Sequence, residues 1–444
     1  DIRKEGSAYD LTIAIGILIA SEQIKGVNKV EDYYIMGELS LDGTLQPIRG
    51  ALSVAIEAKK RGKRGLILPA QNAREAAIVA DIEVLGVHNI KEVIDFFNEE
   101  KEIERITINT REEFQRSLNN YEFDFSDVKG QENIKRALEI AAGGGHNVIL
   151  IGPPGSGKTM LAKRLPSILP PLTLHEALET TRIHSVAGKM SRYASLISIR
   201  PFRSPHHTIS DVALVGGGSS PQPGEISLAH NGVLFLDELP EFKRTVLEVM
   251  RQPLEDRFVT IARSKYSVDF PASFMFIAAM NPCPCGNYNH PKIPCTCGQG
   301  LVQKYLNKVS GPLMDRIDIH VEVVPVTHEE LASTKPVEKS EEIRKRVIKA
   351  RAIQNKRFAE YERIHCNAQM SRKQVEQYCR ISTEGEKLLK TAMERLGLSA
   401  RAYDRILKVA RTIADLEESP EIEIEHLSEA INFRSLDRDN WGRR

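Results

Sequence analysis

Eight consecutive residues have the composition and spacing of a phosphate-binding loop. They lie between the apolar run 147–151 and an amphipathic stretch, 160–169, and they read Gly152, Pro153, Pro154, Gly155, Ser156, Gly157, Lys158 and Thr159. A glycine-rich turn between a strand and a helix lets backbone N–H groups close around phosphate oxygens, and the helix N-terminus adds favourable partial charge. In this pattern the lysine reaches the β- and γ-phosphates and the threonine hydroxyl binds Mg²⁺. The pattern predicts an ATP site; a glycine-rich turn that matches by chance is the alternative.

An acidic pair ends a second apolar run. Residues 232–236 lead into Asp237 and Glu238. In a phosphate-loop enzyme Asp237 would hold the Mg²⁺ shell, and Glu238 would orient and polarise the attacking water. We therefore expect an ATP hydrolase. A buried strand that ends in a helix N-cap is the alternative.

Three more polar residues stand where they could sense the γ-phosphate. Asn281 ends the apolar run 274–280, and its alternative role is a turn before a proline. Arg316 lies just ahead of the final predicted strand, where it could act in trans as an arginine finger on a neighbouring subunit; a surface ion pair is the alternative. Arg401 opens a helix in the C-terminal region and is our candidate for a second sensor of the same phosphate.

Four of the six cysteines crowd into a short segment, as two C-x-C-G turns: Cys283, Cys285, Cys295 and Cys297. Thiolates paired across two tight turns can close a tetrahedral Zn²⁺ site, with His290 as a substitute ligand. Free buried thiols and redox-active disulfides remain open as alternatives. Cys366 and Cys379 lie in helical surroundings and are expected in the core.

The elements that must position these residues divide the chain into several parts. Strands alternate with helices over 125–326, which predicts an α/β core with a parallel sheet and a cysteine-rich insert at 283–298. Residues 1–100 predict a compact α+β domain, and 341–444 a helical lid with helices at 341–360, 371–379, 383–396, 400–418 and 425–432. The charged stretches 101–124 and 327–340 are expected to be linkers.

Composition limits the classes of protein that are possible. The 444 residues are 41% hydrophobic and 27% charged with a net charge of +1, so no field of the whole protein recruits nucleic acid and any basic surface must be local. The longest apolar run, 11–20, is about half the length that a membrane span needs. The cysteine usage argues against a secreted disulfide scaffold, so we expect a cytoplasmic protein with no membrane partner. The chain starts at Asp1 without a methionine, which indicates a fragment.

Taken in order, these motifs resemble the magnesium-chelatase-like branch of the AAA+ ATPases and, more narrowly, the competence protein ComM (YifB) group. The stretches that carry the narrower resemblance are 200–207, 216–218, 223–232 and 281–286. The resemblance implies a homo-hexameric, ATP-driven DNA helicase that acts on single-stranded and branched DNA. It further implies that the ring promotes branch migration while single-stranded DNA is integrated in natural transformation or recombination, together with recombination proteins.

The same resemblance gives a role to a predicted β-hairpin, 258–270. In helicases of this branch a comparable hairpin points into the ring pore. Arg263 and Lys265 at its tip would then contact DNA phosphates without sequence preference, and a solvated hairpin tip is the alternative.

Residues 37–50 resemble the Lon protease domain, whose active members use a Ser–Lys dyad. The lysine position falls on Leu52 and the serine position on Ala8, with Ser7 one residue away. A hydroxyl without a base is not activated, so we expect an N-terminally truncated, proteolytically inactive domain that serves as ring scaffold or contact surface. A protein remodeller or Lon-like protease is the alternative function, and a chelatase motor subunit is a third.

Overall fold

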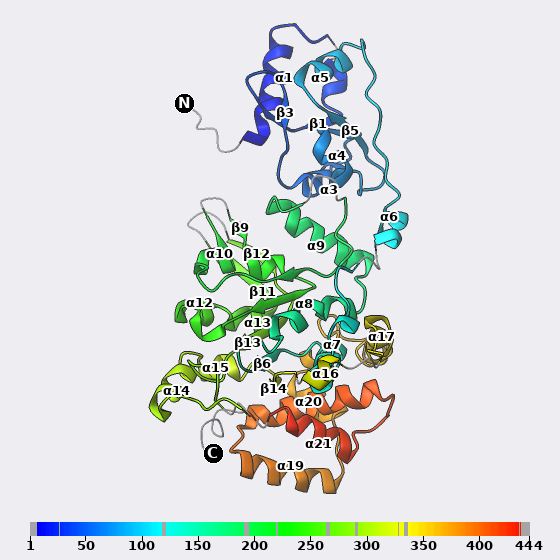
Figure 1. Cartoon of the computed structure of the whole chain (residues 1–444). Helices are drawn as coiled ribbons and strands as arrows, with labels where there is room; N and C mark the ends of the chain where they lie inside the picture. The colour runs from blue at the N-terminus through cyan, green and yellow to red at the C-terminus, as the bar shows by residue number, and fades with distance from the viewer. Residues whose placement is uncertain are drawn as a thin grey trace. The chain divides into compact units, whose positions relative to one another are not determined.

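The computed structural model describes residues 7–25, 27–117, 121–190, 195–218, 221–262, 267–288, 292–326, 328–332, 336–434 and 436. The chain forms two compact units, which are drawn in Figure 1. The N-terminal unit comprises residues 1–120 and 172–199, and the C-terminal unit comprises 121–171 and 200–444.

The N-terminal unit is built on a small parallel sheet. Its three strands are ordered β1-β4-β5, with bounds Tyr33–Ile35, Gly65–Pro69 and Glu83–Val87. A two-stranded antiparallel pair, β2 (Glu38–Leu39) and β3 (Leu45–Gln46), follows β1. The helices are η1 (Ser7–Tyr9), α1 (Asp10–Ala20), α2 (Val27–Val30), α3 (Ala51–Lys60), α4 (Ala70–Ala76), α5 (Ile90–Phe97), α6 (Thr110–Ser117) and α9 (Leu174–Val186).

Two parts of this unit differ from the expected boundaries. Helix α6 lies in the stretch expected to be a linker, where acidic residues in its first turn and Arg116 in its last turn complement the helix dipole. Residues 172–199, expected within the α/β core, belong to the N-terminal unit because α9 packs on α3. Leu52 of α3 and Ala177 of α9 share one buried cluster with Leu172. This packing joins residues far apart in the chain, so no local pattern indicated it.

The C-terminal unit is organised around a five-stranded parallel sheet, as the alternation of strands and helices predicted. The strand order is β14-β6-β13-β10-β7, with bounds Ile319–Glu322, Val148–Ile151, Met275–Met280, Val233–Leu236 and Phe202–Arg203. The three central strands are buried at every residue, which is why they read as continuous apolar runs. Strand β13 therefore lies between the strand that leads to the phosphate loop and the strand that ends in Asp237.

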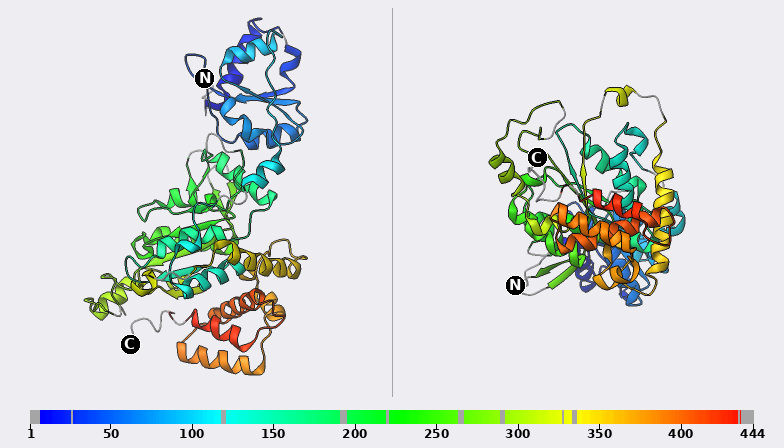
Figure 2. Two further views of the ribbon diagram at one scale, coloured as in Figure 1. Left: turned by 45° about the vertical axis from the view of Figure 1, so that its right-hand side comes forward. Right: turned by 90° about the horizontal axis from the view of Figure 1, so that it is seen from below.

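Helices and two hairpins surround this sheet in Figures 1 and 2. The hairpins are β8 (Gly216–Gly217) with β9 (Gln222–Pro223), and β11 (Phe258–Ala262) with β12 (Ser267–Pro271). The helices are η2 (Phe125–Asp127), α7 (Glu132–Gly144), α8 (Lys158–Ile168), α10 (Asp211–Val215), α11 (Glu225–Leu228), η3 (Leu239–Glu241), α12 (Arg244–Val249), α13 (Arg251–Asp256), α14 (Gln299–Leu306), α15 (Gly311–Met314) and α16 (His328–Ala332). Helix α16 lies in the second stretch expected to be a linker.

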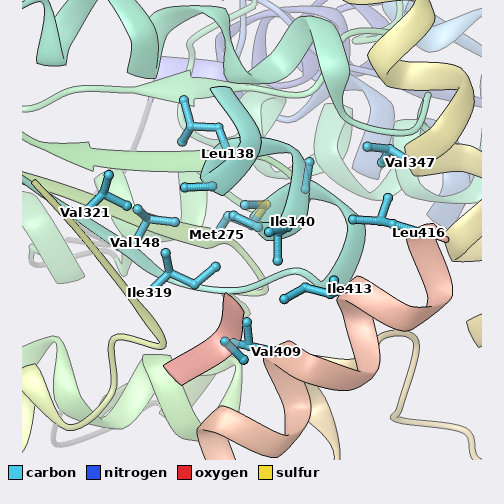
Figure 3. Close-up of a cluster of buried hydrophobic side chains, with 14 of the residues drawn as sticks. Leu138, Ile140, Val148, Met275, Ile319, Val321, Val347, Val409, Ile413 and Leu416 are labelled. Carbon is cyan, nitrogen blue, oxygen red and sulfur yellow. The ribbon is translucent and has the colours of Figure 1, made fainter. Parts of the chain in front are cut away.

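The C-terminal helices share a hydrophobic core with the sheet. They are α17 (Ser340–Arg357), η4 (Asn367–Gln369), α18 (Arg372–Tyr378), α19 (Thr383–Leu396), α20 (Ala400–Leu416) and α21 (Ile424–Asn432), close to the bounds that the periodicity predicted. Figure 3 shows Ile413 and Leu416 of α20 beside Ile140 of α7, with Val148 of β6 in the same buried cluster. Among the described residues no helix is long and apolar enough to cross a membrane.

Candidate nucleotide site

The predicted phosphate loop joins β6 to α8 at the carboxyl edge of the sheet. The loop lies so close to Val323, the residue after β14, that a Cβ on Gly152 would be 2.2 Å from the carbonyl oxygen of Val323, so only glycine fits there. Lys158 is the first residue of α8 and is only 8% exposed. Its Nζ donates to the carbonyl oxygens of Gly152 at 2.7 Å and Pro153 at 2.8 Å. The ammonium is thus held inside the turn that would cradle the phosphates.

Burial lowers the pKa of Lys158, while the carboxylates of Asp237 and Glu238 act in the opposite direction. A buried cation beside two carboxylates is suited to an anionic ligand that brings a metal ion with it.

The acidic pair lies directly opposite the loop. The Thr159 hydroxyl donates to Asp237 Oδ2 at 2.6 Å, so the two oxygens expected to hold Mg²⁺ are already adjacent. Glu238 follows in a left-handed conformation, with φ of 52°. For a residue other than glycine this conformation is strained and is typical of functional sites.

Asn281 lies beside Lys158 because β13, the strand that precedes it, lies between β6 and β10 in the sheet. Parallel strands present their carboxyl ends at one edge, and the order β6-β13-β10 therefore brings Asn281 between Lys158 and Asp237. Asn281 Oδ1 accepts a hydrogen bond from Lys158 Nζ at 3.3 Å. The structure thus brings together five of the residues singled out in the sequence: Lys158, Thr159, Asp237, Glu238 and Asn281.

Arg316 and Arg401 do not lie with these five residues. The carbonyl of Arg316 accepts from Asn147 Nδ2 at 2.9 Å, and Asn147 directly precedes β6, so this arginine belongs to the amino edge of the sheet. The guanidinium of Arg316 pairs with Glu255 at 2.5 Å, and Arg401 Nη1 lies 3.3 Å from Asp315 Oδ2. The four residues of β6 separate the two edges by about 13 Å. The fold therefore does not group either arginine with Lys158 of the same chain.

A buried polar cluster fixes the segment around Arg316. Asp318 is 5% exposed and pairs with Arg405 of α20, while its Oδ2 accepts from the backbone N–H of Asn147 at 3.1 Å. His146 Nδ1 lies 3.4 Å from the same oxygen, and its Nε2 contacts Thr412 Oγ1 at 2.8 Å. Burial alone would raise the pKa of Asp318, but Arg405 and His146 hold it below its usual value. Helix α20 is thereby tied to the segment that carries Arg316.

His207 also belongs to this site, although the sequence indicated no contact between it and Glu238. Its Nδ1 lies 3.3 Å from Glu238 Oε2, and its ring lies 4.1 Å from that of His206. The pair lies inside the stretch 200–207; from the sequence the two histidines could be ligands, and hydrogen-bonded structural histidines are the preferred interpretation. Its approach to Glu238 depends on the pairing of β7 with β10, which the sequence did not reveal.

The structure brings together the sulfur atoms of four cysteines: Cys283, Cys285, Cys295 and Cys297. Their ligand atoms all lie within 4.8 Å of one another, with Sγ–Sγ distances of 3.3 Å for Cys283–Cys285 and 3.6 Å from each of these to Cys295. A tetrahedral site with Zn–S bonds of about 2.3 Å requires sulfurs about 3.8 Å apart, which is close to this arrangement. Burial raises the pKa of Cys283 to about 12, whereas backbone N–H groups of Asn287 and Thr296 lower that of Cys285 to about 5.

The remaining predicted residues are two core cysteines, the basic residues of the hairpin tip and one histidine. Cys366 and Cys379 are each 3% exposed, as expected for core residues. Arg263, Lys265 and His290 lie outside the described residues, although β11 and β12 do form the predicted hairpin.

The N-terminal unit places apolar side chains at both positions of the expected protease dyad. Leu52 is fully buried in the first turn of α3, and Ala8 packs against a hydrophobic cluster of the same unit. The hydroxyl of neighbouring Ser7 donates to Glu38 Oε2 at 2.6 Å. Ser7 thus has a carboxylate partner rather than a lysine amine at this contact.

Comparison with known protein families agrees with this fold and site. Residues 124–331 match the family model "Magnesium chelatase, subunit ChlI", residues 337–434 match "Magnesium chelatase, subunit ChlI C-terminal", and residues 1–72 match "Subunit ChlI of Mg-chelatase". The chain belongs to the magnesium-chelatase-like family of AAA+ ATPases.

Within this family the chain is similar to the ComM/YifB group. It is 42% identical over 439 residues to the "Competence protein ComM" of Haemophilus influenzae, covering 99% of this chain and 84% of that protein. It is 44% identical over 439 residues to the "Uncharacterized protein YifB" of Escherichia coli, again covering 99% and 84%. A more distant match, 30% identical over 230 residues, is to "Lon protease 2" of Bacillus subtilis, covering 44% of this chain and 40% of that protein.

Proposed function

We propose that this chain is one subunit of a homo-hexameric, ATP-driven DNA helicase. It would promote branch migration while single-stranded DNA is integrated during natural transformation or recombination. The observation that carries the proposal is the division of the candidate site between two edges of one sheet: Lys158 and Glu238 at one edge and Arg316 at the other. A site so divided is completed when the amino edge of one subunit meets the carboxyl edge of the next, as in a ring.

The proposed hydrolysis assigns each residue a task. The phosphate loop and Lys158 bind the β- and γ-phosphates, and Asn281 orients the γ-phosphate or the water. Thr159 and Asp237 supply the oxygen ligands that Mg²⁺ prefers, and the bound ion would neutralise phosphate charge. Glu238 polarises the attacking water, and release of its contact with His207 would free the carboxylate for this task. Arg316 and Arg401 would stabilise the transition-state charge from the neighbouring subunit.

Contact with DNA is assigned to the hairpin of β11 and β12, through Arg263 and Lys265 at its tip. Contacts of this kind neutralise phosphates irrespective of sequence, which suits a motor on single-stranded and branched DNA. The relative named Competence protein ComM supports the role in transformation, and we place the protein in the cytoplasm with recombination proteins as partners. The four-cysteine cluster would hold one Zn²⁺.

The other parts of the chain receive supporting roles. Residues 1–100 would be a proteolytically inactive Lon-like scaffold, 125–326 the ATPase core, and 341–444 a helical lid. A protein remodeller is the second candidate, because of the similarity to a Lon protease.

Strand displacement on branched and linear DNA tests the proposal, with Glu238→Gln as the key variant. We expect ATP-dependent displacement by the native chain and turnover slower by about 100-fold in Glu238→Gln, because the attacking water is no longer polarised. Glu241→Gln is the matched control, since this nearby carboxylate pairs with Lys308 at 3.1 Å instead and the change should leave turnover intact.

Parallel reactions with an unfolded protein distinguish the second candidate. ATP hydrolysis stimulated by unfolded protein, without displacement of any DNA, would refute the helicase and favour the remodeller.

A further inference from the structure

We propose that the four-cysteine cluster is a metal-dependent brace of the nucleotide site: one thiolate-bound Zn²⁺ holds Asn281 and the phosphate loop in their binding positions. The brace deepens the function proposed above, since it acts on the same ATP site. It requires neither DNA nor a partner subunit.

The first connection between the cysteine cluster and the nucleotide site is the segment that leads from β13 to Cys283. Strand β13 ends at Met280, Asn281 follows and contacts Lys158, and Cys283 comes only two residues later. Cys283 is fully buried and packs in the hydrophobic cluster on one side of the sheet. A metal bound to its sulfur would therefore anchor the chain immediately beyond the asparagine that orients the γ-phosphate.

The second connection is the segment that follows Cys297 and forms helix α14. Helix α14 begins two residues after Cys297, and its Tyr305 is only 8% exposed. Burial raises the pKa of the Tyr305 phenol, and the backbone of Asn281 hydrogen-bonds to it. Both ends of the cysteine-rich segment therefore converge on Asn281, and a shared metal ion would join them across the intervening loop.

The third contact reaches the phosphate loop itself. Gly286, which follows the first cysteine pair, has φ of +81°, and a Cβ there would lie 2.5 Å from Cδ of Pro154. Pro154 is the third residue of the phosphate loop. The turn that carries Cys283 and Cys285 is thus packed against the loop with no room for a side chain.

The surroundings of the sulfurs suit a metal-bound thiolate cluster. Backbone N–H groups of Tyr288, Asn287 and Thr296 reach the sulfurs of Cys283 and Cys285, and the N–H of Cys297 reaches Cys295 Sγ at 3.4 Å. N–H donors of this kind orient thiolate ligands and stabilise their charge. Four sulfurs that converge at these distances satisfy the soft, tetrahedral preference of Zn²⁺.

The test measures metal content and nucleotide affinity on the full chain, without DNA. Elemental analysis of reduced protein should find one Zn²⁺ per chain, and Co²⁺ substitution should give the visible bands of a tetrahedral thiolate site. Removal of Zn²⁺ with a chelator that spares Mg²⁺ should weaken binding of a fluorescent ADP analogue about 10-fold, or about 1.4 kcal/mol. Added Zn²⁺ should restore it.

Two pairs of variants separate the brace from general damage. Cys295→Ala should lose both the metal and the nucleotide affinity, whereas Cys379→Ala, a buried cysteine outside the cluster, should keep both. Gly286→Ala should keep the metal but weaken nucleotide binding, because its methyl group collides with Pro154. Gly62→Ala is the matched control, because this glycine also has a positive φ, +68°, and an added Cβ there meets nothing within 4 Å.

Each result decides a different question. Protein without Zn²⁺ would overturn both the metal site and the brace. Bound Zn²⁺ whose removal leaves the affinity unchanged, with Gly286→Ala also unchanged, would overturn the brace and leave the metal site standing. Failure of the helicase assay would not affect either conclusion, since no DNA is present here.

Discussion

The two aspartates that flank Arg316 and Ile317 in the sequence, Asp315 and Asp318, offer a sharp test of how helix α20 is held in the C-terminal unit. Asp318 and Asp315 each pair with an arginine of α20, but in different environments. The side chain of Asp318 is 7% exposed and that of its partner Arg405 is 21% exposed. The corresponding values are 34% for Asp315 and 69% for Arg401. The two substitutions Asp318→Asn and Asp315→Asn are therefore the same chemical change at a buried and at an exposed ion pair.

The expected magnitudes follow from burial. Breaking a buried pair leaves an uncompensated charge and costs about 3–5 kcal/mol. Because Arg405 keeps some access to water, we expect the lower end, about 3 kcal/mol, for Asp318→Asn. An exposed pair contributes about 0–1 kcal/mol, so Asp315→Asn should be nearly neutral.

Urea unfolding followed by far-ultraviolet circular dichroism measures the difference. With a slope of about 3 kcal/mol per molar urea, the midpoint of Asp318→Asn should fall by about 1 M, and that of Asp315→Asn by about 0.3 M or less. Pulse proteolysis gives the same ranking if the two units unfold separately. Equal shifts, or a larger shift for Asp315→Asn, would refute the reasoning from burial.

Three further predictions concern the nucleotide site and its support. Lys158→Ala should abolish ATP binding, because the loop loses its only buried ammonium at the phosphates; tight binding measured by calorimetry in this variant would contradict the assignment. Arg316→Ala subunits mixed with Lys158→Ala subunits should recover part of the ATPase activity, since some interfaces then combine an intact loop with an intact finger; no recovery would argue against action in trans. Burial lowers the pKa of His146, which faces Asp318, Lys408 and Arg351, so the unfolded chain takes up the proton first and stability should fall as the pH drops below about 6.5. His146→Gln should flatten the melting temperature between about pH 7.5 and 5.5, and identical profiles would count against a buried neutral imidazole.

The sequence predicted the local elements well because their patterns are complete within a few residues. The helix 383–396 was predicted with the bounds of α19, where Ser382 caps its first turn and Gly397 ends it in a left-handed conformation. The buried strands β6, β10 and β13 were equally visible as apolar runs. Strand β5, with a glycine inside it, was not predicted from its sequence.

What the sequence could not predict are the contacts between distant segments. The short strand β7 pairs with β10 through only two residue pairs, and this pairing carries His207 toward Glu238. Similarly, the packing of α9 on α3 takes residues 172–199 out of the expected core. The pairing of β7 with β10 and the packing of α9 on α3 depend on contacts between segments that are distant in the sequence. The residue pattern within any one of these segments does not predict them.

By itself, the sequence determined the chemistry of the candidate site: a loop of glycines with Lys158 and Thr159, an acidic pair after a strand, and four cysteines in two turns. These are contiguous motifs, whose backbone conformation follows from the residues within them. Only the tertiary structure decided that Asn281 lies between the loop and the acidic pair, that Arg316 lies at the other edge, and that Gly286 packs on Pro154. The physical reason is the order of the strands, which is fixed by the burial of side chains from the whole sheet and not by the residues of any one strand.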